Sequence, residues 1–231
     1  MFKSSTIFRN NTPVSTNIII INTLVWGACM LSQSKGIDLT KMLGLHFVVA
    51  GDFKPFQFFT YMFMHSTDSM AHLFFNMFAV FMFGRIIEST WGSARFLTFY
   101  LITGIGAGLI QQLAWWYDLH QVLSSTAEMI RFDDGQFLAK TAYLNYFVTV
   151  GASGSVFGIL LAFGMMYPNV PLYIMFIPIP VKAKYVVIGY GIIELGAGIV
   201  NFTGDNIAHF AHLGGMLFGF ILIKIWQRRA R

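Results

Sequence analysis

The stretch that decides the fold is FVTVGASGSVFGILLAFGMMY, residues 147–167. It carries no charged residue, and it reaches the roughly 20 residues that a helix needs to cross a bilayer. Ser153 lies inside it, within Gly151-Ala152-Ser153-Gly154. A polar side chain at such a depth usually faces a cavity or a protein partner rather than lipid. The stretch therefore predicts a membrane-spanning segment that carries a polar site.

The composition of the whole chain also indicates a membrane protein. Of its 231 residues, 56% are hydrophobic and 11% are charged, whereas about 25% are charged in a soluble domain. The net charge of +5 raises nucleic-acid binding as an alternative. Because basic residues beside apolar spans more often set membrane orientation, we expect no nucleic-acid partner. The single cysteine, Cys29, excludes an intrachain disulfide and is interpreted as a packing residue.

Six apolar runs are long enough to cross a bilayer, so the sequence predicts an all-α membrane protein, a bundle of six transmembrane helices. The second run is interrupted by His65 and Asp68, and we expect its embedded part to begin near Ser69. Prolines from Pro168 onward mark a non-helical turn between the fourth and fifth runs. The runs cover residues 14–31, 58–84, 96–116, 147–167, 185–202 and 207–226.

The loop charges predict how the bundle is oriented. Six spans place both chain ends on one side, and ten of the 15 basic residues fall on that side. The excess predicts cytoplasmic termini. We expect a tail at residues 1–13, one six-span domain at 14–226 and a basic tail at 227–231. Since no cleavage site of small residues follows the first segment, this segment is interpreted as a tail. A bacterial plasma membrane is the membrane that we expect for a compact six-span chain.

Polar residues of three spans are predicted to share one layer of the membrane. The second, fourth and sixth spans all run inward from the outer face. At about 1.5 Å per residue from the expected span starts, His72 lies ~5 Å deep, Asn76 ~10 Å, and Ser153 and His212 ~9 Å. The start of the fourth span is taken as Phe147. The four polar groups should therefore converge in the outer leaflet.

Glycines predict that the fourth and sixth spans pack closely. Gly154 and Gly158 are four residues apart in the fourth span, and Gly215 and Gly219 are four apart in the sixth. Pairs of small residues at this spacing allow helix backbones to approach each other. Such packing would bring the serine of one span within hydrogen-bond reach of the histidine of the other.

These polar residues predict nucleophilic catalysis. Neutral His212 is a suitable base for removing a proton from Ser153. Attack on a peptide carbonyl develops an oxyanion, for which His72, Asn76 and backbone N–H groups around Ser153 are the expected donors. No carboxylate is expected at this depth, since Asp205 is interpreted as a helix-start or loop residue. The sequence therefore predicts a dyad rather than a triad.

Three residues near this layer each have two interpretations. Phe157, one turn below Ser153, supports the imidazole ring or is an ordinary packing aromatic. His209 shares a face with His212 and is an alternative base. Glu194 is a packing carboxyl of the fifth span, or it belongs to a proton pathway or gate. Since no local ligand motif such as His-Glu-x-x-His is present, we expect neither a metal nor another cofactor.

Together the motifs resemble the rhomboid family of intramembrane serine proteases, over about residues 56–222. The resemblance implies a six-helix bundle that admits a substrate helix laterally and cleaves it near the outer leaflet. It implies Ser153 and His212 as the dyad, and His72 and Asn76 at the oxyanion hole. The His-x-x-Gly-x-x-x-Gly spacing begins at His212, which favours it over His209 as the base. The motifs are His72-x-x-x-Asn76, Glu88-x-x-x-Gly92-Ser93, Gly151-Ala152-Ser153-Gly154 and Ala211-His212-x-x-Gly215-x-x-x-Gly219.

The chain departs from the family pattern at two places. Phe56-Gln57 stands where Trp-Arg is frequent, and Phe157 stands where a tyrosine is frequent. We predict an intramembrane serine endopeptidase that acts on single-span membrane proteins within the lipid bilayer. The alternatives are a catalytically silent rhomboid-like protein that binds membrane helices, and a small transporter, which predicts inverted repeats.

Overall fold

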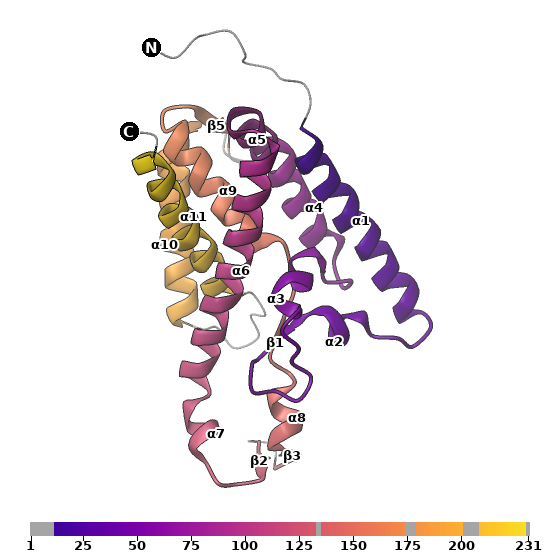
Figure 1. The fold of residues 1–231 in the computed structure, drawn as a ribbon. Helices are drawn as coiled ribbons and strands as arrows, with labels where there is room; N and C mark the ends of the chain where they lie inside the picture. Colours follow the sequence, from indigo (N-terminus) through magenta and orange to yellow (C-terminus); the bar gives the residue numbers. More distant parts are fainter. Residues whose placement is uncertain (1–11, 133–134, 174–178, 201–207, 230–231) are drawn as a thin grey trace.

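The structure is a computed structural model that describes residues 12–132, 135–173, 179–200 and 208–229. Its long apolar helices lie side by side in a bundle (Figure 1). Within the described residues, five helical segments are long and apolar enough to cross a membrane: Pro13–Gln33, Met70–Trp91, Ser93–Asp118, Ala183–Val200 and His209–Arg229. A sixth apolar helix, Ser153–Met166, is shorter. The predicted all-α bundle of membrane helices is confirmed.

Short helices and paired strands connect these segments. Three antiparallel pairs, β1 with β4, β2 with β3 and β5 with β6, lie in the connections. In chain order the elements are α1 (Pro13–Gln33), α2 (Leu39–Leu43), β1 (Leu45–His46), α3 (Gln57–Thr60), η1 (Tyr61–Phe63), α4 (Met70–Ala79), η2 (Val80–Gly84), α5 (Arg85–Trp91), α6 (Ser93–Asp118), α7 (His120–Ser124), β2 (Met129–Arg131), β3 (Phe137–Ala139), α8 (Lys140–Leu144), β4 (Val148–Thr149), α9 (Ser153–Met166), β5 (Pro171–Tyr173), β6 (Pro180–Lys182), α10 (Ala183–Val200) and α11 (His209–Arg229).

The second span begins where the sequence predicted. Ser69 is the N-cap of α4, and its hydroxyl accepts a hydrogen bond from the Ala71 N–H at 3.2 Å, which satisfies one of the donors that every helix start leaves open. The helix then continues through the π-helical turn η2 and through α5 to Trp91. The predicted end at residue 84 is therefore wrong, because the polar residues of α5 continue the helix. Gly92, with φ of 83°, makes the sharp turn into α6.

The fourth span differs more from the prediction. Residues 147–152 are not helical, β4 pairs with β1, and α9 begins only at Ser153. The depth assigned to Ser153, which counted helical rise from residue 147, is therefore wrong. Ser153 is instead the first residue of its helix, and the non-helical segment 147–152 leads into it. The fifth and sixth spans are α10 and α11, and the residues expected at their junction, Asp205 among them, lie outside the described residues.

The loop after α1 is anchored by Gln57, which stands at one of the two departures from the family pattern. This side chain is fully buried. Its Oε1 accepts from the N–H groups of His46 (3.3 Å) and Lys54 (3.0 Å), and its Nε2 donates to the carbonyls of Met42 (3.2 Å) and Asp52 (3.0 Å). One amide thus ties four backbone positions together, so the loop is held without the Trp-Arg pair.

The start of α1 and the end of α11 lie at the same end of the bundle, whereas α2, β1, α7 and α8 lie at the opposite end (Figure 1). This arrangement agrees with an even number of crossings. The assignment of the first end to the cytoplasm stays a prediction. The division into tails at 1–13 and 227–231 around a domain at 14–226 also stays a prediction, although α11 itself continues to Arg229.

Candidate functional site

The close approach of α9 and α11 creates the geometry of the site. A Cβ built on Gly215 would overlap the carbonyl oxygen of Gly154. One turn further on, a Cβ on Gly219 would lie 3.5 Å from the Cα of Gly158. The two backbones therefore touch along the glycine pairs that the sequence predicted to pack. Any larger side chain at Gly215 would push α11 away from α9.

A glycine also shapes the entry to α9. Gly151 has φ of 134°, a conformation that L side chains rarely adopt. Its N–H donates to the Tyr61 carbonyl at 2.9 Å, and a Cβ at this position would lie 2.9 Å from Nε2 of His72. Gly151 therefore lets the chain turn into the helix while the His72 ring lies directly against the backbone beside Ser153.

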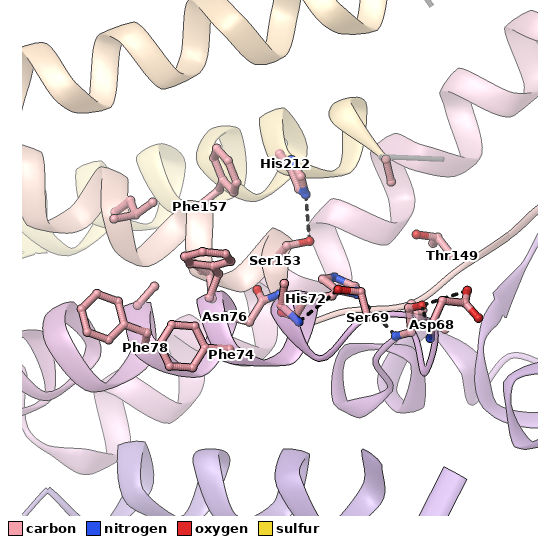
Figure 2. Close-up of a pocket in the computed structure, with 18 of the residues that line it drawn as sticks. Asp68, Ser69, His72, Phe74, Asn76, Phe78, Thr149, Ser153, Phe157 and His212 are labelled. Carbon is pink, nitrogen blue, oxygen red and sulfur yellow. Dashed lines mark hydrogen bonds between the residues drawn. The ribbon is translucent and has the colours of Figure 1, made fainter. Parts of the chain in front are cut away.

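Ser153 and His212 are in direct contact, as Figure 2 shows. Oγ of Ser153 and Nε2 of His212 are joined by a 2.8 Å hydrogen bond. The Phe157 ring stacks on the imidazole, with ring centroids 4.3 Å apart and planes inclined by 6°. Of the two interpretations of Phe157, the structure favours support of the imidazole. Stacking from one side and the hydrogen bond at one edge both limit rotation of the ring.

His72 and Asn76 lie on the other side of Ser153, one helical turn apart on α4 (Figure 2). Nδ1 of His72 accepts a 3.4 Å hydrogen bond from the Ser66 N–H. A neutral imidazole that accepts at Nδ1 carries its hydrogen on Nε2, which is the nitrogen that faces Gly151. Nδ2 of Asn76 donates one hydrogen to the His72 carbonyl at 2.8 Å, and a primary amide has a second hydrogen to give. Both side chains can therefore donate toward the start of α9.

Further support for the His72 ring comes from His65, which precedes α4. The rings are in edge contact with centroids 5.0 Å apart. Burial, together with the neighbouring His72, lowers the pKa of His65 to about 3. His65 is therefore an uncharged packing partner at neutral pH, and it adds no positive charge beside the donors.

Glu194 corrects the prediction that no carboxylate accompanies His212. It lies in α10, is 8% exposed, and places Oε2 2.9 Å from Nδ1 of His212. The same oxygen and Nδ1 of His209 are joined by a 2.7 Å hydrogen bond. The imidazole of His212 thus lies between two groups, Ser153 at Nε2 and Glu194 at Nδ1. The arrangement is a serine, a histidine and a carboxylate in series.

The ligand atoms of Glu194, His209 and His212 lie within 4.8 Å of one another, a grouping that is able to hold a metal ion. A His-Glu-x-x-His motif holds ligands that are close in sequence, whereas these three side chains converge from two helices. Their mutual contacts are equally those of two imidazoles that share a carboxylate. The expectation of a metal-free site stays a prediction.

The site opens into a cavity of about 1490 Å³. Ser153, His72, Asn76, His212 and Phe157 all line it. Most of its other lining residues are apolar, although residues 66–69 and the segment after α1 add polar groups. The apolar lining residues include Phe74, Phe75 and Phe78 of α4, which are half exposed, and Met82 and Phe83 of η2. The polar groups therefore meet at the wall of an apolar space.

The structure brings Ser153, His212, His72 and Asn76 close together, as the sequence predicted, but the contact between Glu194 and His212 was not predicted. Two signals pointed toward it. Glu194 is the only charged residue of the fifth predicted span, and a lone carboxyl at that depth needs a polar partner. His209 and His212 are three residues apart and present two imidazoles on one helix face.

Comparison with known proteins gives a consistent result. A family model described as the Rhomboid domain matches residues 52–229. The chain is 28% identical over 173 residues to the rhomboid protease AarA of Providencia stuartii, covering 70% of this chain and 52% of AarA. It is 27% identical over 220 residues to the chloroplastic Rhomboid-like protein 11 of Arabidopsis thaliana, covering 91% of this chain and 64% of the relative. The chain spans less than two thirds of the length of these curated relatives.

Proposed function

Since this chain belongs to the rhomboid family, we propose that it is an intramembrane serine endopeptidase in which Ser153 is the nucleophile and His212 the base. The observation that carries the proposal is the 2.8 Å hydrogen bond between Ser153 Oγ and His212 Nε2 at the wall of an apolar cavity. A serine is a weak nucleophile until an adjacent base removes its proton. A binding protein has no need for this pairing.

The first chemical step forms an acyl-enzyme. As Oγ of Ser153 bonds to the scissile carbonyl carbon, its proton moves to Nε2 of His212 and the carbonyl electrons move to the oxygen. The tetrahedral intermediate then collapses: the C–N bond breaks, and the proton on His212 leaves with the amine. Water attacks the acyl-enzyme with His212 as base, which releases the acid and restores the Ser153 hydroxyl.

Three kinds of donor serve the oxyanion. Nε2–H of His72 and the second Nδ2 hydrogen of Asn76 are the side-chain donors. The third is the N–H of Ser153, which belongs to the first turn of α9, where backbone donors have no partner within the helix and the helix dipole favours negative charge. Donors that are fixed before the reaction stabilise the charge as it develops, at no cost of reorganisation.

The substrate we propose is a single-span membrane protein. The cavity that leads to Ser153 has apolar walls, as expected for a chain that arrives from lipid. A carbonyl within a helix is hydrogen-bonded and sterically covered, so the substrate must unwind at the bond that is cut. By family resemblance, small residues at this bond and helix-breaking residues beyond it are expected.

The proposal is tested by labelling with a fluorophosphonate probe, together with cleavage of a transmembrane test substrate in liposomes. Wild-type protein should be labelled and should cleave. Ser153→Ala should lose both signals while its thermal unfolding in detergent is unchanged, because the hydroxyl is small and lies at a cavity. Absence of Ser153-dependent labelling from correctly folded wild-type protein favours the alternative, a rhomboid-like protein that binds membrane helices without cutting them.

We place the chain in the cell membrane with both termini in the cytoplasm and the site toward the outer leaflet. The charge asymmetry of the predicted loops supports this orientation. Cysteine-accessibility labelling checks it in a Cys29→Ala background: a cysteine at Ser125, at the end opposite the termini, should react from outside. A reagent that reaches Ser125 only from the cytoplasm would reverse the orientation.

A further inference from the structure

Glu194 has no role in the mechanism above, although it is a buried carboxylate at the base itself. It lies inside α10, where a carboxylate is costly unless it has polar partners. Its Oε2 is 2.9 Å from Nδ1 of His212 and accepts from His209 at 2.7 Å. Both neighbours are imidazoles that belong to α11. The carboxylate therefore joins α10 to the base of the reaction.

The contact with His212 is short, but it is bent. Nδ1 of His212 is buried and makes no aligned hydrogen bond among the described residues, although Oε2 lies only 2.9 Å away. Catalytic hydrogen bonds are often poorly aligned before substrate binds and tighten in the reacting complex.

We propose that Glu194 is a positioning residue, which acts on the reaction by holding His212 with its hydrogen on Nδ1 and its lone pair on Nε2 toward Ser153. The proposal deepens the serine-protease function and rests on it. It replaces the predicted dyad by a series of Ser153, His212 and Glu194.

The physical reason lies in the two tautomers of imidazole. A neutral ring carries its hydrogen on either nitrogen, and only the form with hydrogen on Nδ1 can accept a proton from Ser153 at Nε2. An acceptor beside Nδ1 selects this form. When the ring then takes the proton of Ser153, the carboxylate stabilises the imidazolium, and such an interaction is stronger in a medium of low dielectric. Glu194 itself gains no proton in this scheme.

His209 fits the scheme as a partner of the carboxylate rather than as the base. Its Nδ1 is engaged by Glu194, and its ring lies 6.4 Å from the His212 ring, nearly perpendicular to it. The hydrogen bond from His209 fixes the position of Oε2 between the two rings. This explains why two histidines on one helix face have different tasks.

The first test compares Glu194→Gln with Glu194→Asp, using the full chain in liposomes and a transmembrane test substrate. The amide has the same shape but no charge, and it can donate toward Nδ1 and so favour the wrong tautomer. We expect kcat to fall about 10- to 1,000-fold with KM nearly unchanged, a part of the 10²–10⁴ that a positioned base contributes. Glu194→Asp should recover part of the rate, because it restores a carboxylate. Ile193→Ala, at an exposed neighbour in α10, is the matched control and should leave kcat unchanged.

The second test observes the tautomer directly. In protein labelled with ¹⁵N-histidine, the wild-type His212 signals should report hydrogen on Nδ1, and Glu194→Gln should shift the population toward hydrogen on Nε2. The signals are assigned by their loss in His212→Ala. The proposal is overturned if Glu194→Gln leaves kcat unchanged. It is also overturned if the tautomer of His212 is unchanged and unfolding of the variant explains the fall in kcat.

Two outcomes distinguish a failure of this inference from a failure of the proposed protease function and from a metal site. If wild-type protein neither cleaves nor labels at Ser153, the proposed function fails and the role of Glu194 in it fails also, whereas cleavage that is indifferent to Glu194→Gln defeats only the inference. If EDTA abolishes wild-type cleavage and shifts the His209 and His212 signals together, the three side chains hold a metal ion, which overturns the positioning role. We expect EDTA to leave both readouts unchanged.

Discussion

Two buried carboxylates at different places in the bundle are held in different ways. Glu88, in α5, is 1% exposed and accepts four hydrogen bonds: Oε1 from the Val14 N–H (3.0 Å) and the Ser93 hydroxyl (2.7 Å), and Oε2 from both the N–H and the hydroxyl of Ser15 (2.7 Å each). Glu194 uses one oxygen for two imidazoles. The first carboxylate has a full set of neutral donors, and the second faces groups that can change their protonation.

The two sites show that a buried carboxylate in a membrane protein can serve either structure or chemistry. Glu88, in α5, accepts from donors in the first turn of α1 and in the first turn of α6, so it ties the start of one helix to the start of another and satisfies donors that helix starts leave open. Glu194 ties α10 to a histidine whose proton must move. We therefore expect substitutions at Glu88 and its donors to alter stability, and substitutions at Glu194 and the residues of the site to alter turnover.

The largest effect on kcat should follow His212→Ala, which removes the imidazole that Glu194 contacts. Removal of the base should lower kcat by about 10⁴-fold, the upper range for a positioned base, with little change in thermal unfolding. Cleavage assays and thermal unfolding in detergent measure the two quantities. His209→Ala is the control and should lower kcat far less than His212→Ala, because His209 contacts the carboxylate of Glu194 rather than Ser153. An inactive His209→Ala beside an active His212→Ala would reverse the assignment of the base.

Removal of an oxyanion donor should have the second largest effect on kcat. His72→Ala and Asn76→Ala should each lower kcat by about 10²- to 10³-fold, because loss of one oxyanion donor removes about 2.7–4 kcal/mol of transition-state stabilisation. KM should hardly change, since the donors act on a charge that exists only during the reaction. Steady-state kinetics on the test substrate separates the two constants. A rise in KM at constant kcat would remove these residues from the oxyanion role.

Glu88→Gln should lower the free energy of unfolding rather than kcat. The amide cannot accept with both of its ends, so either the donors of Val14 and Ser93 or the two donors of Ser15 lose their acceptor, and we expect unfolding to become easier by about 2–3 kcal/mol. The kcat of the folded fraction should stay the same. Ser93→Ala, which removes one of the four hydrogen bonds, should cost about 1 kcal/mol. A specific fall in kcat without loss of stability would break the contrast with Glu194.

The smallest effect concerns the ring that stacks on His212. Phe157→Leu keeps an apolar side chain but removes the ring, and we expect kcat to fall about 2- to 10-fold, in line with the 0.5–1.5 kcal/mol of a stacked pair. Phe157→Tyr keeps the ring and should stay near wild type. Kinetics of the two variants provides the comparison. Equal activity of the leucine variant and wild type would reduce Phe157 to packing alone.

Much of the fold followed from apolar length and from the spacing of glycines. The apolar helices, the start of the second span near Ser69 and the contact between the glycines of α9 and α11 were all predicted. The start of α9 was not, because residues 147–152 are as apolar as the helix they precede, and an apolar run does not by itself distinguish strand from helix. Gly151 turns the chain at this point, and its φ of 134° becomes visible only in the structure.

The candidate site shows the same division. The sequence placed Ser153, His212, His72 and Asn76 in one layer from the parity of the spans and from helix rise, although the rise counted for Ser153 is wrong because residues 147–152 are not helical. The distance from Glu194 to His212 depends instead on how α10 is rotated about its axis and on how closely it packs against α11. No local pattern contains either quantity.

The amino-acid sequence is thus sufficient to predict a membrane protein of six apolar helices with a serine, two histidines and an amide in one layer, because the cost of polar groups in lipid leaves few ways to place them. The packed bundle was needed to show that Ser153 begins its helix, that Phe157 lies flat on His212, and that a carboxylate from a separate helix reaches the far side of the imidazole. These are contacts between side chains of different helices, and they depend on helix rotation and approach, which the chain settles only when it packs.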